Sequence, residues 1–170
     1  MMDSATLVKA LEFTRSRLLG TLDTIEKIAT EKGHSPATVL AWRPGPGRAH
    51  IAWQAMHCAA THDKYLNVGL LGKTPVNEAI VTAFGGGSTP ADNNVPTLDA
   101  IREKLSSTYM AFKSHIAGLD TDGLARMIPG PNNTQRSVGE AIILLTWHEA
   151  HHQGQIHLTW NLYKAAHGLV

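Results

Sequence analysis

Apolar residues recur every three or four positions along most of the chain, which is the spacing of one face of an α-helix. The pattern predicts four long helices, at residues 4–32, 49–68, 97–119 and 137–166. It also predicts one or two helical turns in each of three short segments, at residues 35–42, 76–84 and 121–127. No segment alternates convincingly between apolar and polar residues, so the pattern predicts no β-strand.

Stretches rich in proline and glycine separate the long helices. Residues 43–47 read Arg-Pro-Gly-Pro-Gly and residues 129–133 read Pro-Gly-Pro-Asn-Asn, and neither a helix nor a strand continues through such a sequence. Residues 85–96 are also rich in turn formers and nearly free of charge. We interpret them as a mobile loop, with a lid over a functional site as the alternative. Four long helices joined by short breaks indicate an all-α fold, a four-helix bundle that forms one domain over residues 1–170.

The composition is that of a globular protein. The chain has 170 residues, of which 43% are hydrophobic and 17% are charged, so it can bury one substantial core. The net charge is +1 and no run of lysine and arginine occurs, so we expect no nucleic-acid partner. No segment is apolar and long enough to cross a bilayer, and the first residues do not resemble a secretory leader, so we expect a cytoplasmic protein. The single cysteine, Cys58, excludes an intramolecular disulfide and a cysteine-based zinc site, and we expect a buried, inert thiol.

The last predicted helix carries the main candidate chemistry. It opens with Ser137-Val-Gly-Glu140, a capping box in which the serine and glutamate side chains bind backbone N–H groups of the first turn. Steps of three and four residues predict an inward stripe that is apolar at both ends and polar in the middle. Its members are Val138, Ala141, Leu145, His148, His152, Gln155, Thr159 and Leu162. Polar groups in a core cost free energy unless something satisfies them, and a bound metal would do so.

Three histidines are candidate metal ligands. His148 and His152 stand one turn apart on the same helix face, and His57 lies on the inward stripe of the helix predicted at residues 49–68. Three neutral imidazoles suit Zn²⁺, Ni²⁺, Fe²⁺ or Cu²⁺ better than Mg²⁺ or Ca²⁺, and we favour Zn²⁺ or Ni²⁺. Three protein ligands leave a position for water or substrate, as in a catalytic site. A water or thiol bound there would lose its proton near neutral pH.

Neighbouring residues leave alternatives open. His151 could replace one of the ligands, contact a substrate or support the site from outside, and Gln155 could orient a ligand or water. The string from His148 to His152 also satisfies the metalloprotease pattern His-Glu-x-x-His, which would make Glu149 a general base. We favour this interpretation less, because only His157 and His167 lie downstream as a third ligand and no strand accompanies the string.

The pattern also allows an interpretation without a metal. Histidines at this spacing are commonly surface or hydrogen-bonded residues. His62 is about 140° round an ideal helix from His57, so we expect it to point away from the candidate site. Trp53, Trp147 and Trp160 are expected to be core aromatics, and the first two could wall a pocket beside the ligands.

Two strings resemble the signatures of a known family. Residues 49–57 (Ala-His-Ile-Ala-Trp-Gln-Ala-Met-His) and 148–156 (His-Glu-Ala-His-His-Gln-Gly-Gln-Ile) look like the two signatures of the DinB-like (DNA-damage-inducible) superfamily. This superfamily includes YfiT-like metal-dependent hydrolases and bacillithiol- and mycothiol-dependent S-transferases. The resemblance implies a four-helix bundle, a divalent metal held by His57, His148 and His152, and frequent homodimers.

The chain departs from the family pattern at two places. Relatives often have an acidic residue shortly after the first histidine, where this chain has Thr61-His62-Asp63. Relatives also often have arginine before the Gly-Gln of the last signature, where Gln153 stands, which puts the binding of an anionic thiol in doubt. The resemblance favours transfer of a low-molecular-weight thiol to an electrophilic substrate. The alternatives are metal-dependent hydrolysis, a non-enzymatic metal-binding stress protein, and a purely structural helical dimer.

Overall fold

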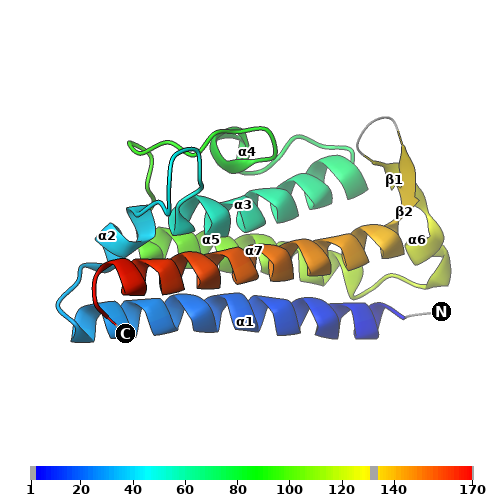
Figure 1. Cartoon of the computed structure of the whole chain (residues 1–170). Coiled ribbons are helices and arrows are strands. Elements are labelled where there is room, and N and C mark those ends of the chain that lie inside the picture. The colour runs from blue at the N-terminus through cyan, green and yellow to red at the C-terminus, as the bar shows by residue number, and fades with distance from the viewer. Residues whose placement is uncertain (1–2, 131–133, 170) are drawn as a thin grey trace.

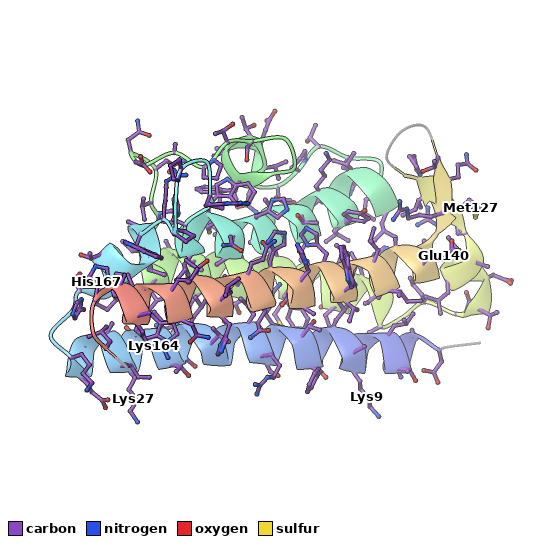
Figure 2. All side chains as sticks on the ribbon, viewed as in Figure 1. Lys9, Lys27, Met127, Glu140, Lys164 and His167 are labelled. Carbon is purple, nitrogen blue, oxygen red and sulfur yellow. The ribbon has the colours of Figure 1, made fainter. Side chains whose placement is uncertain are left out.

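The computed structural model describes residues 3–130 and 134–169, in which four long helices lie side by side (Figure 1). These are α1 (Ser4–Glu31), α3 (Ile51–Lys64), α5 (Leu98–Ile116) and α7 (Val138–Ala166). α1 and α7 run in one direction, while α3 and α5 run in the other. Charged side chains such as Lys9 and Lys27 point away from the bundle (Figure 2). The predicted all-α fold is confirmed.

Short elements connect the long helices. They are α2 (Pro36–Ala41), α4 (Glu78–Phe84), α6 (Thr121–Ala125), β1 (Met127–Pro129) and β2 (Gln135–Ser137). The two strands pair antiparallel, with Ile128 opposite Arg136. The prediction of no strand was therefore wrong, because strands of three residues are too short to show an alternating pattern. The break predicted at residues 129–133 begins inside β1, and its residues 131–133 lie outside the described part of the chain.

The helix predicted at residues 49–68 changes geometry near its end. α3 stops at Lys64, and the chain continues to Leu70 as a π-helix, η1 (Tyr65–Leu70), whose hydrogen bonds span one more residue per turn. His50 begins α3, because its Nδ1 accepts a hydrogen bond from the backbone N–H of Trp53 at 3.0 Å. Residues of this wider turn line the cavity described below.

Helix ends follow the expected chemistry. The predicted capping box is present: the Ser137 hydroxyl accepts from the Glu140 N–H at 3.2 Å, and the Glu140 carboxylate accepts from the Ser137 N–H at 2.7 Å. At the end of α1, Gly33 adopts a φ of 76°, the left-handed conformation that glycine takes without strain. None of the helices in the described residues is both long and apolar enough to cross a membrane.

Two apolar clusters form the core, and α7 passes through both. One contains Val138, Ala141, Ile142 and Leu145 of this helix, and the other contains Ile156, Trp160 and Tyr163. Between them the buried side chains of α7 are those of Glu149 and His152. The polar interruption that the sequence predicts therefore lies in the middle of the bundle.

Candidate metal centre

The structure brings the three candidate histidines together from two helices. One ring nitrogen of each of His57, His148 and His152 lies within 4.8 Å of the others. The Nε2 atoms of His57 and His148 are 3.0 Å apart. His57 comes from the middle of α3, and the other two come from successive turns of α7, as their spacing predicts.

Contacts fix the ring of His57 with one nitrogen free for a ligand. Its Nδ1 donates a hydrogen bond to the carbonyl oxygen of Phe84, at the end of α4, at 2.6 Å. The ring also stacks on Trp53, with ring centroids 4.8 Å apart and planes tilted by 11°. Because Nδ1 carries the proton, Nε2 presents a lone pair towards His148. A histidine whose second nitrogen donates to a carbonyl is typical of metal ligands in proteins.

The donor set fits a divalent ion. Nδ1 of His148 and Nδ1 of His152 are buried without a hydrogen-bond partner in the described residues. Nitrogens bound to tetrahedral zinc at about 2.0–2.1 Å stand roughly 3.4 Å from one another. The Nε2 atoms of His57 and His148, at 3.0 Å, are close to that separation, and a ring nitrogen of His152 lies within 4.8 Å of the other two ligands. Two buried imidazoles and the half-buried imidazole of His148 can therefore hold a metal ion.

Burial keeps these histidines neutral. Burial, together with a smaller effect of repulsion from the neighbouring histidines, lowers the pKa of His148 to about 4 and the pKa of His152 to about 3. Burial also lowers the pKa of His57, against the opposing effect of its hydrogen bond to Phe84. At neutral pH all three rings are unprotonated, which is the state that binds metals.

We predict that the metal-free protein loses stability as the pH falls below 6.5. In the unfolded chain His148 and His152 bind protons near pH 6.5, whereas in the folded protein they do so only near pH 4 and pH 3. Between these values the unfolded state holds more protons, so the free energy of unfolding falls with pH by up to about 1.4 kcal/mol per unit for each histidine. Urea titrations at pH 7.5 and 5.5 measure the effect. The double variant H148N/H152N should show a shallower decline, and an equal decline in both proteins would contradict the assignment.

A cavity of about 420 Å³ opens onto His57 and His148. Its walls come from α3, η1, the start of the loop after α4, and the β-hairpin. Its remaining lining residues are mostly small or apolar: Ala60, Thr61, Lys64, Tyr65, Val68, Gly69, Gly85, Gly86, Pro129 and Gly130. Lys64 is the single cation among the described lining residues, and none of them is an aspartate or glutamate. The cavity can therefore seat an apolar molecule directly beside the histidine cluster.

A buried carboxylate holds the helices around the site. Arg15 of α1 donates to both carboxylate oxygens of Glu149 on α7, from Nε at 2.6 Å and from Nη2 at 2.9 Å. Nε2 of His62 on α3 lies 3.1 Å from the same carboxylate, and Arg15 also donates to the carbonyl oxygen of Leu105 on α5. The exposed fractions of the Arg15 and Glu149 side chains are 4% and 0%. One ion pair thus joins all four long helices beside the ligands of α7.

These contacts exclude Glu149 as a general base. Burial alone would raise its pKa, but the contacts with His62 and Arg15 outweigh burial and lower the pKa to about 2. The carboxylate is therefore ionised, occupied by arginine and shielded from solvent. The metalloprotease interpretation of residues 148–152 was wrong, because the glutamate faces the interior of the bundle.

Other predicted residues lie outside the cluster. His151 is exposed, stacks on Trp147 and lies with its Nε2 2.8 Å from Nε2 of Gln155. Gln155 and Leu162 are exposed, so their assignment to the inward stripe was wrong. Trp147 is also exposed and is not a core aromatic. Each lies roughly 90° or more round an ideal helix from the centre of the buried face of α7. A stripe drawn in alternating steps of three and four drifts by about 20° every seven residues, which accounts for Gln155 and Leu162.

Other predictions agree with the structure. Trp160 is buried, and Trp53 stacks against His57. Cys58 is fully buried, and burial raises the pKa of its thiol well above the usual range.

Sequence reasoning missed Arg15 and the Phe84 carbonyl. Arg15 stands in the apolar stripe of α1, four residues after Leu11 and three before Leu18, and both neighbours are buried. A cation within an apolar stripe is a usable signal of a buried anion elsewhere in the chain. The carbonyl of Phe84 gives no such signal, because every residue has one.

The fold and the site define a helical protein with a three-histidine cluster beside an apolar cavity. A family model described as the DinB superfamily matches residues 10–156. The chain therefore belongs to the DinB superfamily.

Comparison with solved structures agrees on the fold. A structure described as a conserved protein of locus from Enterococcus faecalis is similar with a TM-score of 0.73 and 15% sequence identity, covering 95% of this chain and 98% of that one. A search of curated proteins found no match.

Proposed function

We propose that this protein is a metal-dependent thiol transferase in which His57, His148 and His152 hold a divalent ion, Zn²⁺ or Ni²⁺. The observation that carries the proposal is the cavity, which opens directly onto His57 and His148. The ion, when bound, would lower the pKa of a coordinated thiol so that its thiolate is available near neutral pH. The family resemblance supports this choice of chemistry.

The chain's own residues prepare the site for such a reaction. The hydrogen bond to Phe84 fixes which nitrogen of His57 faces the ligand position. The apolar walls exclude water and accept the body of an electrophilic substrate, while Lys64 offers a cation for an anionic group of either reactant. The sulfur forms the new bond to carbon as the leaving group departs with its electron pair, and the thiol proton passes to solvent.

The lining residues favour thiol transfer over hydrolysis. Hydrolytic sites of this kind commonly use a carboxylate as a general base to take a proton from water. No described lining residue is an aspartate or glutamate, and Glu149 is occupied by Arg15. A thiol is far more acidic than water, so its activation does not require such a base.

We expect untagged protein to contain about one equivalent of zinc or nickel by elemental analysis. The variant H57A/H148A should contain none while keeping its helical circular dichroism. With 1-chloro-2,4-dinitrobenzene and a panel of cysteine-containing small thiols, the wild type should form the thioether and His152→Ala should not. His157→Ala, which changes an exposed histidine on the same helix, is the matched control and should behave as the wild type. Wild-type protein that binds no metal would overturn the proposal, and hydrolytic turnover without thioether formation would favour the hydrolase alternative.

A further inference from the structure

The carboxylate of Asp63, in the last turn of α3, is buried and receives hydrogen bonds on both oxygens. Asp63 is 3% exposed. Its Oδ1 accepts from Nδ2 of Asn67 at 2.6 Å and from the backbone N–H of Val76 at 3.1 Å. Its Oδ2 accepts from the backbone N–H and from Nδ2 of Asn77, at 2.7 and 3.1 Å. One side chain of α3 therefore holds both η1, which contains Asn67, and the residues at the start of α4.

The helix α4 depends on this anchor because it is short and lies on the outer side of α3, away from α1 (Figure 1). It has seven residues, and a helix of that length is marginal without support from the rest of the fold. Asparagine commonly caps a helix with its side chain, but the side chain of Asn77, the N-cap of α4, donates to Asp63 instead. The buried side chain of Phe84 secures the other end. Asp63 therefore fixes where α4 begins.

The last residue of α4 contacts the histidine cluster. The carbonyl oxygen of Phe84 accepts the hydrogen bond from Nδ1 of His57 at 2.6 Å. His57 and Asp63 stand six residues apart on α3, which is a rise of about 9 Å, and the seven residues of α4 rise about 10 Å. The short helix therefore has the length needed to reach from one contact to the other. Which ring nitrogen of a histidine carries the proton is set by the hydrogen bond that the ring makes.

We propose that Asp63 is a positioning residue for the candidate metal centre. By holding α4 in place, it keeps the Phe84 carbonyl against His57, which fixes the proton on Nδ1 and the lone pair on Nε2. The consequence for metal binding rests on the proposed function, whereas the protonation pattern of His57 does not. Loss of a residue that supports a metal ligand from outside typically weakens metal affinity roughly 10–100-fold. Asp63 acts through one further contact, so we expect its loss to lie near the lower end of that range.

Nitrogen-15 NMR of the histidine side chains in metal-free protein at pH 7.5 tests the protonation pattern. The wild type should show His57 as a single tautomer with the proton on Nδ1. Asp63→Asn keeps the size of the side chain but places an amide NH₂ group against two of the four N–H donors, so α4 should loosen and His57 should populate both tautomers. The matched control is Asp120→Ala, which removes the carboxylate that accepts from the Gly123 N–H in α6, and it should keep the wild-type pattern. An unchanged His57 tautomer in Asp63→Asn would overturn the proposal.

Zinc affinity, measured by competition with a chromophoric chelator, tests the consequence for the metal. At a temperature where circular dichroism shows each variant fully folded, Asp63→Asn should bind Zn²⁺ roughly 10-fold more weakly than the wild type, and Asp120→Ala should bind it equally well. Equal affinities in all three proteins would overturn the role of Asp63 at the metal centre. A wild type that binds no zinc would refute the proposed function instead, and the tautomer of His57 would still decide whether Asp63 positions that ring.

Asn77→Ala provides a second variant should Asp63→Asn fail to fold. Asn77 is half-buried, and its replacement removes one of the four donors while the buried carboxylate stays paired with the other three. The variant should remain folded and show the same change in the His57 tautomer to a smaller extent. A single tautomer with the proton on Nδ1 in Asn77→Ala would then overturn the proposal.

Discussion

Replacing Glu149 by leucine is expected to lower the free energy of unfolding by about 3–5 kcal/mol, the loss typical of breaking a buried ion pair. The change leaves the Arg15 guanidinium buried without its anion, and the cost of an unpaired buried charge exceeds that of the lost contacts. Urea unfolding at pH 7.5, followed by circular dichroism, measures the difference.

Two further variants make this test specific. The double variant R15M/E149L removes both charges and should recover much of the lost stability. Glu12→Leu breaks the surface pair that Glu12 forms with Lys113, and it should cost less than about 1 kcal/mol. If Glu149→Leu were no more destabilising than Glu12→Leu, the carboxylate would not hold the four helices together.

The second large effect is expected on metal binding. His57→Ala removes one of the three ligands. Loss of a residue that only hydrogen-bonds to a ligand weakens metal affinity roughly 10–100-fold, so we expect His57→Ala to weaken the affinity for Zn²⁺ by more than that. Wild-type protein should gain about 2.7 kcal/mol of stability when free zinc is 100-fold above its Kd, and the variant should gain almost none at the same concentration.

Thermal unfolding with zinc and with a chelator measures this gain. His157→Ala should keep the full zinc-dependent increase, because its side chain is exposed and lies outside the cluster. An equal increase in wild type and His57→Ala would show that zinc binds elsewhere, and no increase in the wild type would show that the cluster does not hold zinc.

The sequence predicted the long helices and the histidine cluster because both depend on local spacing. His148 and His152 share a face whatever the rest of the fold does, and His57 stands on an inward stripe of its own helix. The resemblance to the family signatures implied the same three histidines as metal ligands. Helix ends were also predictable where a capping residue, such as Ser137, marks the first turn.

Features that depend on distant contacts escaped prediction. Glu149 was interpreted from its neighbours in the string, whereas its role comes from Arg15, which lies 134 residues earlier in the chain. The π-helical turn at Tyr65–Leu70 comes from a change in backbone hydrogen bonding that no side-chain pattern reports. The outward position of Gln155 was missed because steps of three and four residues do not determine which side of the helix faces the core.

Helices and connecting segments both line the cavity, and this has a consequence for how its shape can change in evolution. The histidines belong to the long helices, whereas Gly85, Gly86 and Gly130 belong to connecting segments. A Cβ atom at Gly85 would lie 2.3 Å from the Val81 carbonyl oxygen and one at Gly130 would lie 2.7 Å from Thr134 Oγ1, whereas one at Gly86 would meet nothing within 4 Å. Side chains can therefore be added at Gly86 without disturbing the helices. Substitutions at that position can therefore narrow or reshape the cavity while the positions of the three histidines stay the same.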